Sequence, residues 1–170
     1  KTLPREEHEW KAQRAFTATL FTADLSTVGG TEADLDPESE YGGFYFYAQH
    51  MVQTACELFG YFPKSVQAFR CENKITVMIR YKDYDITGIY LFNCGVWLYS
   101  QSVVFEKGCI AGMDPLTNAA SREFHSFYDV LRGEKPHHSY DELFSPVFIM
   151  NAIMRSLESG KEEALPEIKV

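Results

Sequence analysis

The spacing of apolar residues changes at Pro63, and this change constrains the fold more than any other feature of the sequence. Before it, apolar residues recur every three or four positions over Phe44–Phe59, between Gly42-Gly43 and Gly60, which predicts an amphipathic helix. After it, apolar and polar residues alternate over Ile75–Tyr81, as in a strand with one buried face. The chain therefore combines an early helix with a sheet.

Three further segments are expected to be strands of the same sheet, and they lie at 65–72, 85–92 and 97–106. The connections between the four strands are only two or three residues long, which predicts antiparallel pairing of consecutive strands in a meander. An earlier apolar segment, Gln13–Leu25, is another candidate strand.

Two helices are predicted near the end of the sequence. The first is capped at Ser121, has apolar residues at i, i+3, i+4 and i+7 from Phe124, and ends at Gly133. The second begins at the capping box of Ser139 and Glu142 and continues to Gly160. Helices on one face of an antiparallel sheet make an α+β domain, so we expect an open, mainly antiparallel sheet with helices packed on one face.

Composition narrows the class of protein. The 170 residues, 45% of them hydrophobic, fit one domain over 1–170, with a charged segment at 1–14 and an acidic loop at 26–41. The net charge of −8 repels nucleic-acid phosphates, and no apolar run approaches the roughly 20 residues that cross a membrane. Residues 1–14 lack the apolar core of an export signal. We expect a cytoplasmic protein with neither nucleic acid nor membrane as a partner.

Cofactor motifs are not found in this sequence. The four cysteines stand singly and are expected to be reduced core thiols: Cys56, Cys71, Cys94 and Cys109. The pair His137-His138 lacks further ligands at zinc spacing, and Pro37 interrupts the calcium-like run of acids at 34–40, so no metal is expected. Neither a G-x-G-x-x-G nor a G-x-x-x-x-G-K-[ST] motif is present, which predicts that this chain alone binds no nucleotide.

His50 is the best catalytic candidate. It lies on the first helix, on a face with Phe46, Tyr47, Thr54 and Glu57, at the edge between core and solvent. An imidazole in such a place can act as a general acid or base near neutral pH. The alternative is a surface histidine without a chemical role. A self-contained acid–base pair with Glu57 is disfavoured, because two helical turns separate the residues.

Two blocks of sequence resemble the C-terminal domain of Gfo/Idh/MocA-type oxidoreductases. Gly42–His50, followed by a helix that ends at Glu57–Gly60, is similar to the G-G-x-x-x-D-x-G-x-H helix that opens this domain, with one residue fewer after the glycine pair, and His50 falls on the family's histidine. The residues similar to the family's closing two helices and short last strand are Glu123-Phe124, Leu131, Gly133, Pro136, Ser139, Asp141-Glu142, Ala152-Ile153, Ser156, Gly160-Lys161 and Leu165. Together the blocks bracket residues 42–168.

The resemblance implies that this chain is the substrate-binding and oligomerisation half of a dehydrogenase that acts on a sugar, polyol or similar small molecule. NAD or NADP would be bound by an N-terminal Rossmann domain, without which this chain is inert. His50 would exchange a proton with a substrate hydroxyl while the nicotinamide of the other domain carries the hydride. One face of the sheet would join subunits into a homodimer or tetramer.

Two positions depart from the family pattern. Phe46 stands where the family has an aspartate, and Ala48 stands where it has a glycine. We expect Tyr47 or Gln49 to orient the substrate instead, with Phe46 in the same site. The missing carboxylate also favours an alternative, in which the chain is a stand-alone α+β ligand-binding or dimerisation module without redox activity.

Overall fold

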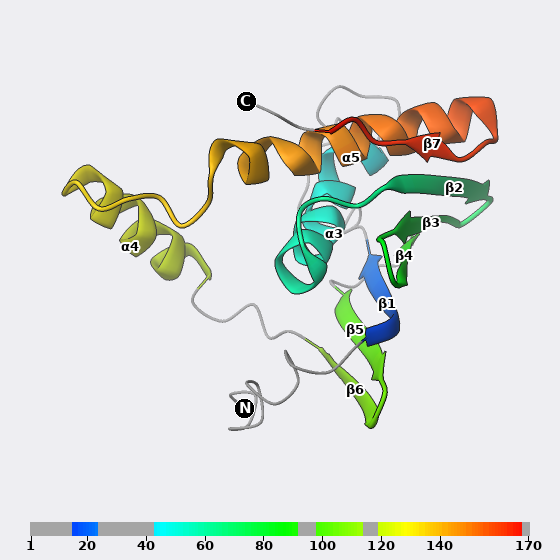
Figure 1. Cartoon of the computed structure of the whole chain (residues 1–170), viewed down its shortest axis with the longest axis horizontal. Helices are drawn as coiled ribbons and strands as arrows, with labels where there is room; N and C mark the ends of the chain where they lie inside the picture. The colour runs from blue at the N-terminus through cyan, green and yellow to red at the C-terminus, as the bar shows by residue number, and fades with distance from the viewer. Residues whose placement is uncertain (1–14, 24–42, 92–97, 114–118, 168–170) are drawn as a thin grey trace.

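The computed structural model describes residues 15–23, 43–91, 98–113 and 119–167. The elements are β1 (Ala15–Ala23), α3 (Gly43–Phe59), β2 (Ser65–Cys71), β3 (Lys74–Arg80), β4 (Asp85–Leu91), β5 (Leu98–Phe105), β6 (Gly108–Met113), α4 (Ala119–Leu131), α5 (Tyr140–Ser159) and β7 (Glu163–Ala164). The strands form one sheet in the order β6-β5-β1-β4-β3-β2-β7. Helices α3 and α5 lie on one face of this sheet, whereas α4 stands apart from both (Figure 1). The expected α+β class, with an open and mainly antiparallel sheet, is confirmed.

The five predicted strands are all present, but one predicted pairing is wrong. β4 does not pair with β5, because β1 lies between them, parallel to β4 and antiparallel to β5. A short connection permits a hairpin but does not impose one when another strand fits better between its two arms. In this central place Ala18 and Leu20 of β1 are buried under α3. At an edge of the sheet these two residues would be left uncovered.

Strand β6 was not predicted, because its two glycines and its lack of clear alternation give a weak strand signal. It forms a hairpin with β5, in which Val103 is opposite Ile110. The short last strand implied by the resemblance is present as β7, where Ser65 of β2 is opposite Ala164.

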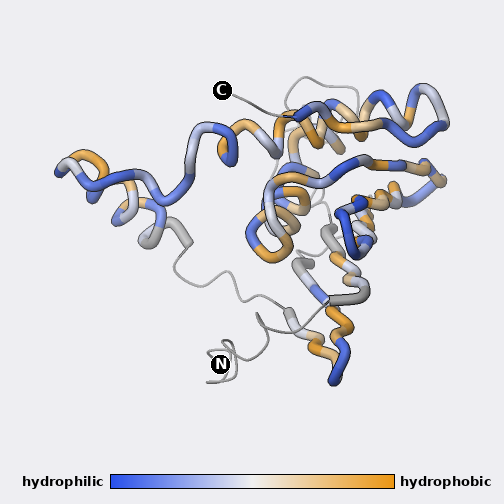
Figure 2. The backbone as a smooth tube through the Cα atoms, in the orientation of Figure 1, coloured by the Kyte–Doolittle hydropathy of each residue, from blue (hydrophilic) through white to orange (hydrophobic). Residues whose placement is uncertain are grey.

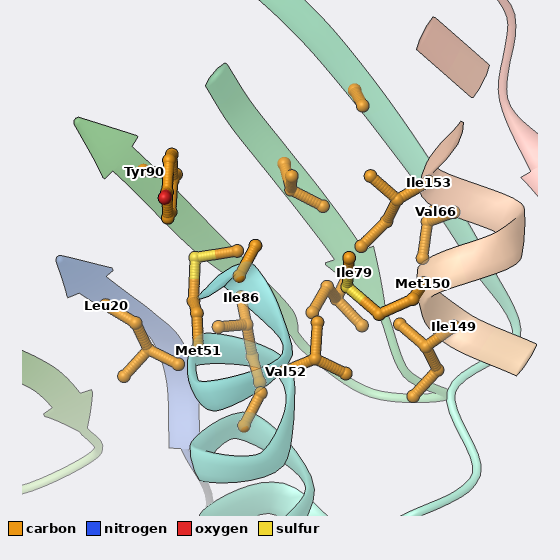
Figure 3. Packing of buried hydrophobic residues seen from close by; sticks show 14 of the residues in the cluster. Leu20, Met51, Val52, Val66, Ile79, Ile86, Tyr90, Ile149, Met150 and Ile153 are labelled. Carbon is orange, nitrogen blue, oxygen red and sulfur yellow. The ribbon is translucent and has the colours of Figure 1, made fainter. Parts of the chain in front are cut away.

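The core lies between the sheet and the two helices that cover it. Met51 and Val52 of α3 extend toward Leu20, Ile86 and Tyr90 on β1 and β4 (Figure 3). In the same view, Ile149, Met150 and Ile153 of α5 lie over Val66 and Ile79 of β2 and β3. The alternating residues of β3 and the stripe of α3 therefore enter one common core.

Gly88 marks the closest approach of α3 to the sheet. A Cβ atom at this position would lie 2.6 Å from the sulfur of Met51 and 2.8 Å from its terminal methyl carbon. Met51 is almost fully buried, so its side chain has little room in which to move.

We expect Gly88→Val to lower the free energy of unfolding by about 1–3 kcal/mol, because the larger side chain overpacks this contact. Urea unfolding would measure the loss, and Met51→Ala should relieve part of it in the double variant, since the two sites are in contact. Gly112→Ala is the matched control, because a Cβ there meets nothing within 4 Å. If Gly88→Val lowered the free energy of unfolding by the same amount with and without the Met51→Ala change, the steric explanation would be wrong.

The capping box predicted for α5 is confirmed. The backbone N–H of Glu142 donates to Oγ of Ser139, and the backbone N–H of Ser139 donates to the Glu142 carboxylate at 2.8 Å. This second hydrogen bond lowers the pKa of Glu142. The helix ends at Gly160, whose φ of 68° is the left-handed conformation that glycine adopts without strain.

Several local predictions need correction. Helix α4 begins at Ala119, so Ser121 lies inside its first turn and is not the cap. Cys56 is buried as expected, but Cys71 and Cys109 are exposed, because both lie on strands near the edges of the sheet. All three are free thiols.

Three predictions concern residues outside the described ranges: Cys94, the charged segment 1–14 and the acidic loop 26–41. Within the described ranges, no helix is long and apolar enough to cross a membrane.

Candidate functional site

Helix α3 presents a stripe of exposed side chains that faces away from the sheet. Its residues are Phe46, His50, Gln53 and Glu57, which recur at intervals of four, three and four. The opposite side of the helix is buried in the core and carries Phe44, Ala48, Met51, Val52, Ala55 and Cys56. We call these four residues the outward stripe. His50 is thus held on a helix that the core makes rigid, while its imidazole lies at the surface.

The structure brings the other predicted site residues close to His50. Phe46 lies one turn before it on the outward stripe, and Gln49 is also exposed. The ring of Tyr47 is half-buried and packs edge-on against Phe46, with ring centroids 5.1 Å apart. The hydroxyl of Thr54 donates to the backbone carbonyl of His50 at 2.8 Å. Aromatic surface therefore borders the imidazole where the family pattern has a carboxylate.

Glu57 belongs to a different cluster, which the sequence did not reveal. Its carboxylate accepts a hydrogen bond of 2.5 Å from the hydroxyl of Tyr61 and lies 3.2 Å from Nε2 of His138. The rings of Tyr61 and His138 are also in contact. Burial, followed by the hydrogen bond to Glu57, raises the pKa of Tyr61, so its hydroxyl remains a donor at neutral pH.

No local motif could have identified this cluster, because His138 is far from Glu57 in the sequence and only the fold brings them together. The contact of His138 with Glu57 attaches the segment between α4 and α5 to the outward stripe, two turns beyond His50.

The neighbouring Cys56 is not a nucleophile candidate. Burial and, to a lesser degree, the charge of Glu57 raise the pKa of its thiol to about 12, which keeps it protonated at neutral pH.

A cavity of about 400 Å³ lies on another part of the domain, between the loop after α3 and the segment after β7. Its lining residues are Tyr61, Phe62, Pro63, Lys64, Ser145, Leu165, Pro166 and Glu167. The hydroxyl of Ser145 donates to the backbone carbonyl of Tyr61 and is therefore already engaged. None of the predicted site residues lines this cavity.

This cavity does not fit a dinucleotide, and the described residues form no cluster of metal ligands. The cavity has a mainly apolar lining whose charged residues are Lys64 and Glu167, and it has no glycine-rich turn, so it offers no cradle for a pyrophosphate. In the ranges that the structure describes, no three His, Cys, Asp or Glu side chains gather as metal ligands. An exposed imidazole, such as that of His50, is a group that can exchange a proton with a bound hydroxyl.

These features define an α+β domain with an open sheet, two covering helices and a histidine on the outer face of the first. No family model matches the sequence, and no curated protein matches it. Solved structures do match: the chain has the fold of the C-terminal domain of Gfo/Idh/MocA-type dehydrogenases, so the resemblance seen in the sequence is confirmed for the fold.

Three solved structures illustrate the match. Myo-inositol 2-dehydrogenase from Lactobacillus plantarum has a TM-score of 0.78 at 12% identity over 95% of this chain. Myo-inositol dehydrogenase from Corynebacterium glutamicum has a TM-score of 0.74 at 13% identity over 96%. The WlbA dehydrogenase from Bordetella pertussis, solved with NADH and UDP-GlcNAcA, has a TM-score of 0.70 at 17% identity over 96%. The match spans only 59–60% of the length of these dehydrogenases.

Proposed function

We propose that this chain is the substrate-binding and oligomerisation half of an NAD(P)-dependent oxidoreductase that acts on a sugar, polyol or similar small molecule. The observation that carries the proposal is the place of His50, exposed at the middle of α3 in a domain with the fold of sugar and inositol dehydrogenases. The free thiols of Cys56, Cys71 and Cys109 are compatible with a reducing, cytoplasmic compartment.

In this proposal His50 exchanges a proton with a substrate hydroxyl. The rigid helix holds the imidazole at the surface, and the rings of Phe46 and Tyr47 beside it offer an apolar wall for a sugar or polyol. Gln49 is exposed one residue before His50 and supplies an amide for hydrogen bonds to further hydroxyls. Hydride exchange belongs to a nicotinamide cofactor that a separate dinucleotide-binding domain would hold.

Calorimetric titration with NAD(H) and NADP(H) tests the proposal. It compares this chain with a version extended upstream by the preceding coding sequence. We expect binding by the extended protein alone, because the described residues form no dinucleotide cradle. If the extended protein binds neither cofactor, or if no such extension exists, the oxidoreductase proposal is wrong.

The second candidate is a ligand-binding or dimerisation module without redox activity. The observation that favours it is Phe46, which is 41% exposed on the outward stripe where the family pattern has an aspartate. The same titration separates the two functions, because a module of this kind binds no nicotinamide cofactor in any form of the protein.

We also propose that the subunits associate through the face of the sheet opposite α3 and α5. No described helix covers this face (Figure 1), and its apolar residues include Phe69, Met78, Ile89 and Val104. We expect a homodimer or tetramer in sedimentation experiments at high micromolar concentration. A monomer under these conditions would contradict this interface.

A further inference from the structure

The cavity after α3 is a concave site that the proposed function does not use. Its volume of about 400 Å³ lies within the range of about 300–1,000 Å³ that is typical of small-molecule sites. Three segments bound it: the loop that follows α3, the first turns of α5 and the segment that follows β7. Figure 2 shows this last segment running back beside α5, whose hydrophobic and hydrophilic positions alternate along the helix.

Hydrogen bonds join the three walls of the cavity to one another. The backbone N–H of Leu165 donates to the carbonyl of Lys64 at 2.9 Å, and the hydroxyl of Ser145 donates to the carbonyl of Tyr61. The hydroxyl of Tyr61 in turn donates to the carboxylate of Glu57 at 2.5 Å. The walls are therefore preorganised, which favours binding because little further ordering is required.

Aromatic and proline side chains form most of the lining. Tyr61 and Pro63 are buried, whereas Pro166 is exposed and Phe62 is 56% exposed. The two prolines restrict the backbone on both sides of the cavity, because the ring fixes φ. A ligand with an apolar group would cover the exposed ring of Phe62, and removing that surface from water favours binding.

One cation and one anion lie among these apolar residues. Lys64 belongs to the loop after α3, and Glu167 belongs to the segment after β7, on the other side of the cavity. Both residues are exposed. Within the described ranges, the ammonium group of Lys64 takes part in no hydrogen bond or ion pair. A lining with one charge of each sign favours a ligand that carries both charges, since a purely anionic or purely cationic ligand would meet a like charge.

We propose that this cavity binds a free α-amino acid with a large apolar side chain. The carboxylate of the amino acid faces Lys64, its ammonium group faces Glu167, and its side chain packs against Phe62 and the ring of Tyr61. For a ligand of this size we expect a dissociation constant of about 1 mM or lower. The proposal does not depend on the oxidoreductase function, because none of the residues proposed to act at His50 lines the cavity.

An NMR titration of the full-length protein with L-phenylalanine tests the proposal. The reporters are the backbone amides of four residues of the cavity walls: Tyr61, Phe62, Lys64 and Leu165. We expect their chemical shifts to change and to saturate. The absence of saturable changes up to about 10 mM ligand, ten times the expected dissociation constant, would overturn the proposal. Saturable changes confined to residues outside the cavity would overturn it as well.

Two further probes separate the contributions of the ring and of the charges. L-alanine keeps both charges and lacks the ring, so it should bind at least about tenfold more weakly. N-acetyl-L-phenylalanine amide keeps the ring and carries no charge. It should bind at least about threefold more weakly, a modest factor because Lys64 and Glu167 are exposed to solvent. Binding of either probe as tight as that of L-phenylalanine would overturn the proposed ligand class.

Variants of the two charged residues locate the ligand. Lys64→Met and Glu167→Gln should each raise the dissociation constant of L-phenylalanine about 3–10-fold, because each removes one charge partner and keeps a side chain of similar size. Lys107→Met is the matched control, since it removes the same charge from the turn between β5 and β6, outside the cavity. Equal effects of Lys64→Met and Lys107→Met, or no effect of either cavity variant, would overturn the proposal.

The histidine of the outward stripe provides the last control. His50→Ala should bind L-phenylalanine as tightly as the unchanged protein, because His50 does not line the cavity. A loss of binding in this variant would assign the amino acid to the face of α3 and overturn the cavity site. Absence of NAD(H) binding would refute the oxidoreductase function and leave this site intact.

Discussion

His50→Ala in the extended protein is expected to lower kcat by about 10²–10⁴-fold, which is the typical contribution of a general acid or base. The imidazole lies at the surface of a helix whose other side is buried, so its removal should leave the fold unchanged. Steady-state kinetics over a range of pH would measure the loss. The variant should also lose the limb of the pH profile that reports the imidazole, whereas a purely structural role would leave that limb in place.

The control for this experiment is Gln53→Ala, which truncates the next residue of the outward stripe and carries no proposed role. NAD(H) affinity should stay the same in both variants, because in the proposed function the cofactor is held by a separate domain. Wild-type turnover in His50→Ala would refute the catalytic role of this residue.

Tyr90→Ala is expected to lower the free energy of unfolding by about 3–5 kcal/mol, the usual cost of removing a large aromatic ring from a core. Tyr90 is fully buried on β4, and its ring packs edge-on against Phe44 with centroids 5.1 Å apart. Truncation would leave a cavity beneath the first turn of α3. Urea unfolding followed by circular dichroism would measure the change, and the m-values of the two proteins should be nearly equal.

Tyr90→Phe is the matched control, because it keeps the ring and removes only the hydroxyl. We expect it to retain most of the stability that the alanine variant loses. A loss below about 1 kcal/mol for Tyr90→Ala would show that the site collapses freely and that the contact between Tyr90 and Phe44 is not a rigid part of the core.

Local chemistry explains which elements were predictable. The limits of α3 and α5 follow from glycines and a capping box, whose hydrogen bonds involve residues at most four apart. The strands at 65–71, 74–80 and 85–91 have every second residue buried over most of their length, as a strand with one face in the core requires. The place of β1 between β4 and β5 did not follow, because strand order depends on contacts between segments that are remote in the sequence.

The candidate site divides in the same way. His50 and Phe46 could be assigned to one face of a helix, since helical spacing alone places them there. The contacts of Glu57 with Tyr61 and His138 could not be foreseen in full, because His138 is remote from Glu57 in the sequence and meets it only in the folded domain. The apolar stripe of α4 was predictable, but its exposure among the described residues was not.

The sequence by itself determined the helices, most of the strands, the α+β class and the candidate histidine, because these depend on the period of apolar residues and on caps within one or two turns. Only the tertiary structure decided that β1 is central, that Glu57 is held by Tyr61 and His138, and that the described residues leave the apolar side of α4 exposed. The physical reason is that burial is a property of the packed whole. A periodic pattern identifies the apolar side of an element but not the surface that will cover it.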